Sequence, residues 1–242
     1  MQSIAGKTAI VTGASSGIGR AIAIELARAG MVTFAAARSL DKLEALVGEI
    51  EGFGGKAVAV RTDVSDEAEV GALFAAVEAQ AGPPALLVNN AGIADATAID
   101  EISLARWREV LDANLTSAML CSREAVRAMK RAGGGCIVNI GSLSAKSPRP
   151  NSPAYTASKF AIEGLTRSLA LDCREFNITA CALHPGQTRS SLVPGVTDRV
   201  LPDQIDPADI GQLVVLIASL PAGIALLDTT ILPARVPFLG RG

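Results

Sequence analysis

Aromatic and charged residues are both scarce in this sequence. Aromatic residues make up 3% of its 242 residues, with a single tyrosine, a single tryptophan and a single histidine. Charged residues make up 19%, the formal net charge is −2, and lysine and arginine form no strongly basic cluster. Nucleic-acid-binding proteins carry a basic patch or stripe, so we expect no nucleic-acid partner.

Cysteine is also scarce, and its spacing is irregular. The four cysteines show no CxxC pair, and each falls within an apolar run. A disulfide framework or a cysteine-based metal site normally shows regular, close spacing. We therefore expect buried, reduced thiols and no metal site at Cys121, Cys136, Cys173 and Cys181.

The sequence lacks clear targeting or membrane signals. Met1 to Gly6 does not have the basic-then-apolar order of a signal peptide. Ile210 to Leu227 is 18 residues long and uncharged, near the length of a membrane span. Pro221 and Gly223 interrupt it, and its apolar residues follow helical spacing up to Leu220. We predict a buried helix there, no membrane partner and a cytoplasmic location.

What the sequence does contain is a regular alternation of short apolar segments with helical ones. Continuously apolar strands are buried on both faces, as in a parallel sheet covered by helices. The predicted strands are Lys7–Thr12, Met31–Ala37, Ala57–Val60, Ala85–Asn89, Cys136–Gly141 and Ile178–Leu183. The predicted helices are Gly17–Ala29, Leu40–Ile50, Glu67–Ala79, Leu104–Arg131 and Ser152–Arg174. No linker divides the chain, which predicts one Rossmann-type, doubly wound α/β domain over residues 1–242.

A glycine-rich turn joins the first strand to the first helix. Glycines at such a place allow a tight turn and close approach of the backbone to a pyrophosphate, which the helix N-terminus then binds. The spacing is GxxxGxG, and a plain tight turn is the alternative interpretation. Its position between strand and helix favours a dinucleotide site formed by Gly13, Ser15, Ser16, Gly17, Ile18 and Gly19.

The end of the second predicted strand bears on the choice between NAD and NADP. An acidic residue there binds the 2′-hydroxyl of NAD, whereas an arginine accommodates the 2′-phosphate of NADP. The chain reads Ala37-Arg38-Ser39 and has no carboxylate at the strand end. We therefore predict NADP as the cofactor in preference to NAD, with a solvent-facing arginine as the alternative for Arg38.

The only tyrosine stands four residues before a lysine. On a helix, Tyr155 and Lys159 project from the same face. A nearby ammonium stabilises a phenolate, so the tyrosine hydroxyl becomes a usable acid-base group near neutral pH. Ser142 ends an apolar strand thirteen residues upstream. These residues predict acid-base chemistry on an oxygen-bearing substrate.

Together these residues resemble the classical short-chain dehydrogenase/reductase family. The resemblance covers roughly residues 5 to 190, and every motif is in the expected order and spacing. It rests on Thr12-Gly13, Gly17-Ile18-Gly19, Asp63-Val64, Asn89-Asn90-Ala91-Gly92, Asn114, Ser142, Tyr155, Lys159 and Pro185-Gly186.

The resemblance implies a role for each matching residue. Tyr155 matches the general acid-base residue, Lys159 its activating lysine and ribose ligand, and Ser142 the serine that holds the substrate oxygen. Asn114 matches the anchor of a water relay, with a plain polar helix residue as the alternative. The implied cofactor contacts further include Asp63, Val64, Asn90, Pro185, Gly186 and Thr188. The family resemblance also implies a homotetramer.

The chain departs from the family pattern in two places. Ser16 stands where many NADP-dependent relatives have a basic residue, and the C-terminal segment Asp228–Arg235 lacks the Asp-Gly-Gly turn of many relatives. That ending is similar to a branch acting on small aldehydes, hydroxy acids and polyols. A substrate loop is predicted over residues 186–206, with Arg189 and Arg199 as candidate anion ligands. His184 is predicted to line the site without acting as a catalyst.

The sequence thus predicts an NADP(H)-dependent oxidoreductase that interconverts a carbonyl and an alcohol on a small molecule. A 3-oxoacyl-carrier-protein reductase is one alternative, with Arg123, Arg127, Lys130 and Arg131 as a weak docking patch. A cofactor-sensing scaffold is a second alternative, although such a protein would be expected to lose Ser142, Tyr155 or Lys159.

Overall fold

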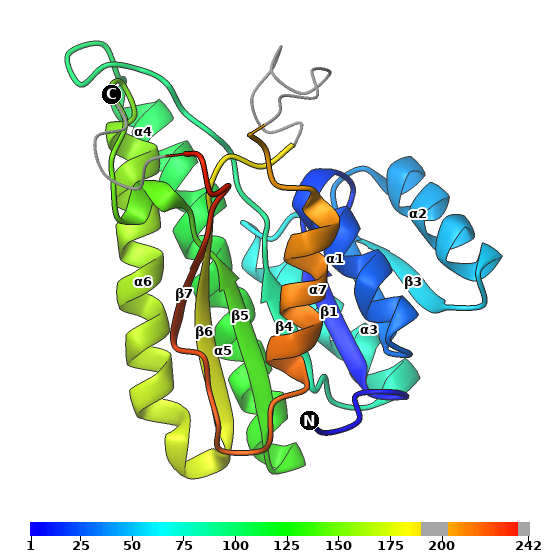
Figure 1. Ribbon diagram of the computed structural model, residues 1–242. Coiled ribbons are helices and arrows are strands. Elements are labelled where there is room, and N and C mark those ends of the chain that lie inside the picture. The colour runs from blue at the N-terminus through cyan, green and yellow to red at the C-terminus, as the bar shows by residue number, and fades with distance from the viewer. Residues whose placement is uncertain (190–202, 237–242) are drawn as a thin grey trace.

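Seven parallel strands form one twisted sheet at the centre of the molecule (Figure 1). The structure is a computed structural model that describes residues 1–189 and 203–236. The strand order is β3-β2-β1-β4-β5-β6-β7, so the direction of strand addition reverses between β1 and β4. The strands are β1 (Thr8–Thr12), β2 (Val32–Ala37), β3 (Lys56–Arg61), β4 (Leu86–Asn89), β5 (Gly135–Ile140), β6 (Ile178–Pro185) and β7 (Asp228–Ile231).

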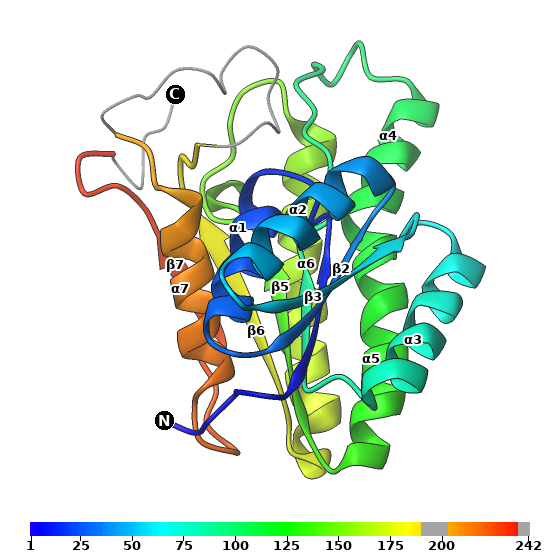
Figure 2. The same cartoon turned by 90° about the vertical axis from the view of Figure 1, so that its right-hand side faces the viewer.

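Helices cover both faces of the sheet, which confirms the predicted doubly wound fold (Figures 1 and 2). Helices α1, α2 and α7 share one buried core with the sheet, and α3, α5 and α6 share the other. The helices are α1 (Gly17–Arg28), α2 (Leu40–Gly52), α3 (Glu67–Ala81), α4 (Leu104–Leu111), α5 (Ser117–Ala132), α6 (Pro153–Cys173) and α7 (Pro207–Ala218).

Alternation along the strands explains why their sequences are mostly apolar. In β1, Ala9 and Val11 enter the core beneath α1 and α7, whereas Ile10 enters the core beneath α3 and α5. Successive side chains of a strand point to opposite faces. Both faces are covered here, so most strand positions are apolar. The exceptions are buried polar residues such as Thr33, Asn139 and His184.

The long helix predicted over Leu104–Arg131 is interrupted. Between α4 and α5 lies a π-helical segment, Asp112–Thr116, with Asn114 buried inside it. The Asn114 side chain forms hydrogen bonds with the backbone of Ile93 on both its N–H and its C=O. A π segment adds a residue to a helical turn and often marks a functional site. Hydrophobic spacing alone did not reveal this insertion.

The uncharged segment near the C-terminus forms most of a helix and the connection that leads to an edge strand. Helix α7 begins after Asp206, whose carboxylate accepts a hydrogen bond from the Ala208 N–H, and it packs against α1. The segment continues through a turn into β7, which pairs with β6 and which the sequence pattern did not reveal. Within residues 1–189 and 203–236, no helix is long and apolar enough to span a bilayer.

Candidate active site

A cleft of about 1060 Å³ opens at the carboxyl ends of the strands. It lies where the strand order reverses, which is where open α/β sheets bind ligands. Of the predicted catalytic and cofactor-binding residues, all but Gly19 and Asn114 line it. The predicted residues on the wall are Gly13, Ser15, Ser16, Gly17, Ile18, Arg38, Asp63, Val64, Asn90, Ser142, Tyr155, Lys159, Pro185, Gly186 and Thr188.

The glycine-rich turn is packed so tightly that side chains would not fit. Gly13 has a positive φ of 65°, and a Cβ there would lie 2.8 Å from the Ala91 Cα. A Cβ on Gly19 would lie 2.3 Å from the Asn90 Nδ2 and 2.4 Å from the Gly13 carbonyl oxygen. Helix α1 starts at once, and the Ser16 side chain does not cap it. Its first N–H groups are therefore available to an anion, as a dinucleotide pyrophosphate requires.

Asn90 fixes this turn to the next strand. Its Nδ2 donates to the carbonyl oxygens of Thr12 at 3.0 Å and Gly13 at 3.2 Å. The Thr12 hydroxyl in turn accepts the N–H of Asn90 at 3.0 Å. These bonds join the ends of β1 and β4 on either side of the switch point. The cradle is therefore rigid before any ligand binds.

Arg38 stands at the adenosine end of the cleft. It is exposed directly after β2, and its guanidinium forms no ion pair within the described part of the chain. Asp63 lies nearby, after β3, where its carboxylate accepts hydrogen bonds from the Ser65 hydroxyl at 2.6 Å and N–H at 3.0 Å. These bonds, helped by the charge of Arg38, hold the pKa of Asp63 below its usual value. Arg38 thus remains free to face an anionic group.

Tyr155 and Lys159 lie one turn apart on α6, and both are 6% exposed. The Lys159 ammonium lies 5.6 Å from the centre of the Tyr155 ring. Its Nζ also donates to the Ile140 carbonyl oxygen at 3.0 Å, which ties α6 to the end of β5. The structure therefore holds the ammonium beside the phenol, as the four-residue spacing predicts.

Ser142 follows β5 and faces the same cleft. Its Oγ accepts a hydrogen bond from the Ser144 N–H at 3.1 Å. That bond uses an acceptor position of the hydroxyl and leaves its proton available to a group in the cleft. Ser142 and Tyr155 thus supply two hydroxyl donors to one end of the cleft.

Asn114 connects this end of the cleft to the loop after β4. Its Nδ2 donates to the Ile93 carbonyl and to the Ser158 Oγ, both at 3.0 Å, and its Oδ1 accepts the Ile93 N–H at 2.7 Å. A Cβ on Gly92 would lie 2.8 Å from the Asn114 Oδ1. Both amide protons are therefore taken, and a water held at this side chain would have to donate to Oδ1.

Two arginines on the cleft wall escaped the sequence reasoning. Arg106 on α4 donates from Nε to the buried Asp95 at 2.8 Å and from a terminal nitrogen to the Ala94 carbonyl at 2.9 Å. Burial raises the pKa of Asp95, but hydrogen bonds from Arg106 and Thr97 outweigh it and lower the pKa overall. Arg149, also on the wall, has no ion-pair partner within residues 1–189 and 203–236. No sequence motif marks either residue.

The predicted substrate loop is only partly described. Gly186 and Thr188 line the cleft, and Arg189 forms an ion pair with Asp206 at 2.5 Å, so its guanidinium is engaged. Residues 190–202, which include Arg199, lie outside the described residues.

His184 does not line the cleft, contrary to the sequence-based prediction. It is in β6 with no exposed surface, behind the backbone of Ser142. The prediction failed because the residue belongs to the strand itself, whose side chain at this position faces the neighbouring strand end.

Comparison with known proteins identifies the family. The sequence model of the short chain dehydrogenases matches residues 7–200. The chain belongs to this family. Short-chain dehydrogenases similar to it include the "3beta-hydroxysteroid dehydrogenase" of Mediterraneibacter gnavus, 41% identical over 77% of this chain and 67% of that protein. The "3-oxoacyl-[acyl-carrier-protein] reductase FabG" of Staphylococcus aureus is 36% identical over 85% of each chain.

Solved structures agree with this assignment. A metagenomic short-chain oxidoreductase in complex with NADP is 33% identical, with a TM-score of 0.85 over 96% of this chain and 99% of that one. The protein is therefore an oxidoreductase of the short-chain dehydrogenase family, whose named relatives act on alcohol and carbonyl groups.

Proposed function

We propose that the protein is an NADP(H)-dependent oxidoreductase that interconverts an aldehyde or ketone and an alcohol on a small molecule. The observation that carries this proposal is the distribution of groups along one cleft. The phosphate turn and Arg38 lie toward one end, and Ser142, Tyr155 and Lys159 lie toward the other. A bound nicotinamide supplies or accepts the hydride; the side chains must manage the oxygen.

The two hydroxyl groups act on the substrate oxygen. In carbonyl reduction, negative charge develops on that oxygen and needs hydrogen-bond donors fixed in advance. Ser142 donates a hydrogen bond from its hydroxyl to that oxygen and holds it in place. Tyr155 donates a hydrogen bond and then transfers its proton, which completes the alcohol. In the oxidation direction, the Tyr155 phenolate removes the same proton.

Lys159 supports this proton transfer electrostatically. Its ammonium, held by the Ile140 carbonyl, lies over the Tyr155 ring and stabilises the phenolate that proton transfer leaves behind. Asn114 fixes the loop that faces the lysine, through its bonds to Ile93 and its contact with Gly92. In the reduction direction, the proton that restores Tyr155 then comes from the side of the π-helical segment and reaches the phenolate by way of Lys159.

Two observations support NADP over NAD. Arg38 ends β2 where a carboxylate would select NAD, and no acid in the described ranges pairs with its guanidinium. The NADP complex of a relative with a closely similar fold agrees with this choice. Ser15 and Ser16, also on the wall, add hydroxyl donors for phosphate.

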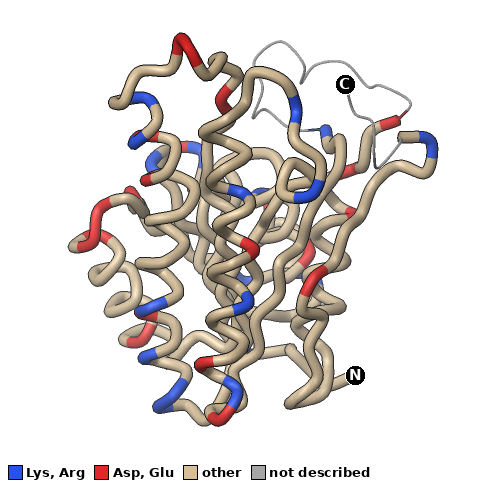
Figure 3. Tube along the Cα trace, turned by 90° about the vertical axis from the view of Figure 1, so that its left-hand side faces the viewer, with Lys and Arg blue, Asp and Glu red and all other residues tan. Residues whose placement is uncertain are grey.

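The alternative of a carrier-protein reductase receives less support. It would need a basic docking patch beside the cleft, and the candidate cations lie on α5. Arg123, Arg127 and Arg131 each form an ion pair with a glutamate. Lys130 and Arg131 also lie at the C-terminal end of α5, just before β5 begins. This places them at the amino ends of the strands, away from the cleft at the carboxyl ends. Basic and acidic positions are interspersed along the helices in Figure 3.

We also propose a homotetramer that buries the outer faces of the long helices. Met119 on α5 and Phe160 and Leu171 on α6 are 39%, 47% and 61% exposed. Apolar side chains of this size on neighbouring helices are typical of a surface that another subunit covers. Sedimentation analysis at micromolar concentration should give four times the chain mass; a monomer would contradict the assembly without affecting the chemistry.

The function is tested by following NADPH consumption with a panel of aldehydes, ketones and 3-oxoacyl thioesters. We expect turnover with small carbonyl compounds and much weaker turnover with carrier-bound thioesters. Preference for the carrier-bound substrates would instead support the acyl-reductase alternative. No turnover with any carbonyl compound, with either cofactor, would contradict the proposal.

A further inference from the structure

The only histidine of the chain is buried directly behind Ser142. His184 lies in β6, beside the end of β5, and none of its side chain is exposed. Its Nδ1 lies 3.4 Å from the Ser142 amide nitrogen and 3.1 Å from the Ser142 carbonyl oxygen. A Cβ on Gly141 would lie 2.4 Å from the same Nδ1, so the ring packs against the backbone that carries Ser142.

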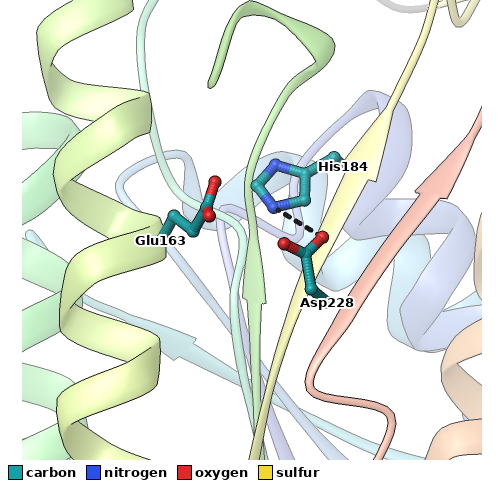
Figure 4. Close-up of side chains that lie close together, drawn as sticks. All are labelled: Glu163, His184 and Asp228. Carbon is teal, nitrogen blue, oxygen red and sulfur yellow. Dashed lines mark ion pairs between the residues drawn. The ribbon is translucent and has the colours of Figure 1, made fainter. Parts of the chain in front are cut away.

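The other ring nitrogen faces a carboxylate. His184 Nε2 lies 3.5 Å from the Asp228 Oδ1 of β7, and Figure 4 shows this side of the ring directed toward the carboxylate. Nε2 is buried and has no hydrogen bond of ordinary length among the described residues. At this distance the electrostatic interaction still matters, because a buried pair is only weakly screened. A proton on Nε2 is attracted to Asp228, whereas a lone pair there is repelled.

The backbone of Ser142 decides which ring nitrogen carries the proton. The Ser142 carbonyl already accepts the Ala145 N–H at 2.9 Å. The Ser142 N–H, by contrast, has His184 Nδ1 as its only acceptor within the described ranges. A proton on Nδ1 would leave this N–H without a partner and would also turn the Nε2 lone pair toward Asp228. Both effects favour the neutral tautomer with its proton on Nε2.

We propose that His184 is a positioning residue for Ser142: Asp228 fixes its tautomer, and its Nδ1 then accepts the Ser142 N–H and sets the backbone that carries the substrate-binding hydroxyl. This inference rests on the proposed role of Ser142 in the reaction. It extends the site behind the cleft wall to His184 of β6 and to β7, because neither His184 nor Asp228 lines the cleft.

A metal ion is the competing explanation for this cluster. Glu163, His184 and Asp228 offer ligand atoms that all lie within 4.8 Å of one another (Figure 4). The cation position is taken, however, by Lys146, whose Nζ binds the Glu163 Oε2 at 2.7 Å and also binds Asp228. Burial lowers the pKa of Lys146, but these two carboxylates outweigh it and raise the pKa overall. The ammonium therefore stays charged and balances the acids.

The charged neighbours also keep the imidazole neutral. Burial is the main cause that lowers the pKa of His184, and Lys146 lowers it further. Asp228, Glu163 and the Ser142 carbonyl, which only a protonated Nδ1 can donate to, raise it. Arg167 of α6 adds positive charge on the far side of Asp228. The net pKa lies below the usual value of about 6.5. At acid pH a proton on Nδ1 would face the Ser142 N–H, donor against donor, and the hydrogen bond from that N–H to Nδ1 would be lost.

A single histidine allows a direct test by NMR. With 15N-labelled histidine, the full-length protein without added ligand should show Nδ1 as an unprotonated nitrogen and Nε2 as a protonated one at pH 7.5. A proton on Nδ1, or the averaged signals of a free imidazole, would overturn the proposal. Addition of Zn²⁺ should leave both signals unchanged, and a shift of Nε2 on Zn²⁺ binding would favour the metal site instead.

Kinetics provide the second readout. His184→Leu fills the space without an acceptor, and kcat should fall about tenfold or more, toward the hundredfold or greater cost of losing an oxyanion donor. His184→Asn places an amide oxygen near the position of Nδ1 and should restore most of kcat. Cys181→Ala, a buried change in the same strand, should leave kcat within about twofold. Equal losses in the Leu and Asn variants would contradict the positioning role.

A double mutant separates this inference from the proposed function. In a Ser142→Ala background, His184→Leu should cause no further loss of kcat, because the hydroxyl that it positions is absent. If Ser142→Ala itself leaves kcat unchanged, the proposed role of Ser142 fails, whatever the tautomer. If Ser142→Ala is inactive but the two losses multiply in the double mutant, the positioning role fails alone.

Discussion

Replacement of Arg38 by aspartate should exchange the cofactor preference of the enzyme. The guanidinium is exposed at the cleft rim, so water screens part of its attraction to a phosphate. Loss of a hydrogen bond to a charged group costs about 1.5–3 kcal/mol of binding free energy. A carboxylate facing the phosphate adds roughly 1 kcal/mol of repulsion. The total of about 2.5–4 kcal/mol corresponds to a loss of NADPH affinity of roughly 60- to 700-fold.

Binding of NADH should change in the opposite direction. The new carboxylate accepts a hydrogen bond from the ribose 2′-hydroxyl, and a gain of about 1 kcal/mol would tighten NADH binding roughly fivefold. Both dissociation constants are to be measured by calorimetry at 0.1 M salt, because exposed charge interactions weaken as salt increases. Arg61, at the end of the adjacent β3, already pairs with Glu69 and does not line the cleft. Arg61→Gln is therefore the matched control and should leave the preference within about threefold. An unchanged ratio of the two constants in Arg38→Asp would refute the ribose argument.

Three further outcomes are expected. Gly19→Ala should weaken NADPH binding at least tenfold, because the added Cβ would lie 2.3 Å from the Asn90 Nδ2. Gly48→Ala, whose Cβ would have no atom within 4 Å, should leave binding unchanged. Calorimetry of both variants measures this difference. Burial raises the thiol pKa to about 12, 11 and 12 at Cys121, Cys136 and Cys181. Thiol reagents at pH 8 should therefore leave the native enzyme unmodified over minutes and should modify it in denaturant. The pKa of His184 is lower in the folded protein, so the unfolded chain binds that proton first as the pH drops. The free energy of unfolding should therefore fall below about pH 6.5. Denaturant unfolding should show a flatter pH dependence for His184→Asn than for the wild type.

The sequence was sufficient for the fold and for most of the cleft. The phosphate turn, Arg38 and the Tyr155–Lys159 pair each follow from a local rule: glycine sterics, charge at a strand end, and one helical turn. Such rules need only neighbouring residues, so the structure brings these groups together along one wall as expected.

Features that depend on distant residues could not be predicted in this way. The π-helical segment at Asn114 depends on hydrogen bonds to Ile93, twenty-one residues away. The position of His184 depends on β7, whose register beside β6 places Asp228 against the ring. Apolar periodicity reports which side of an element is buried, but it does not report which buried polar groups meet.

The most direct test of the account is the Tyr155→Phe enzyme, which loses one hydroxyl and keeps the ring. The account predicts that NADPH binds with a dissociation constant within about threefold of the wild type. It also predicts that carbonyl reduction falls by roughly 100- to 10,000-fold, the usual contribution of a general acid. Near-wild-type turnover in this variant would contradict the account, because the tyrosine would then have no part in proton transfer.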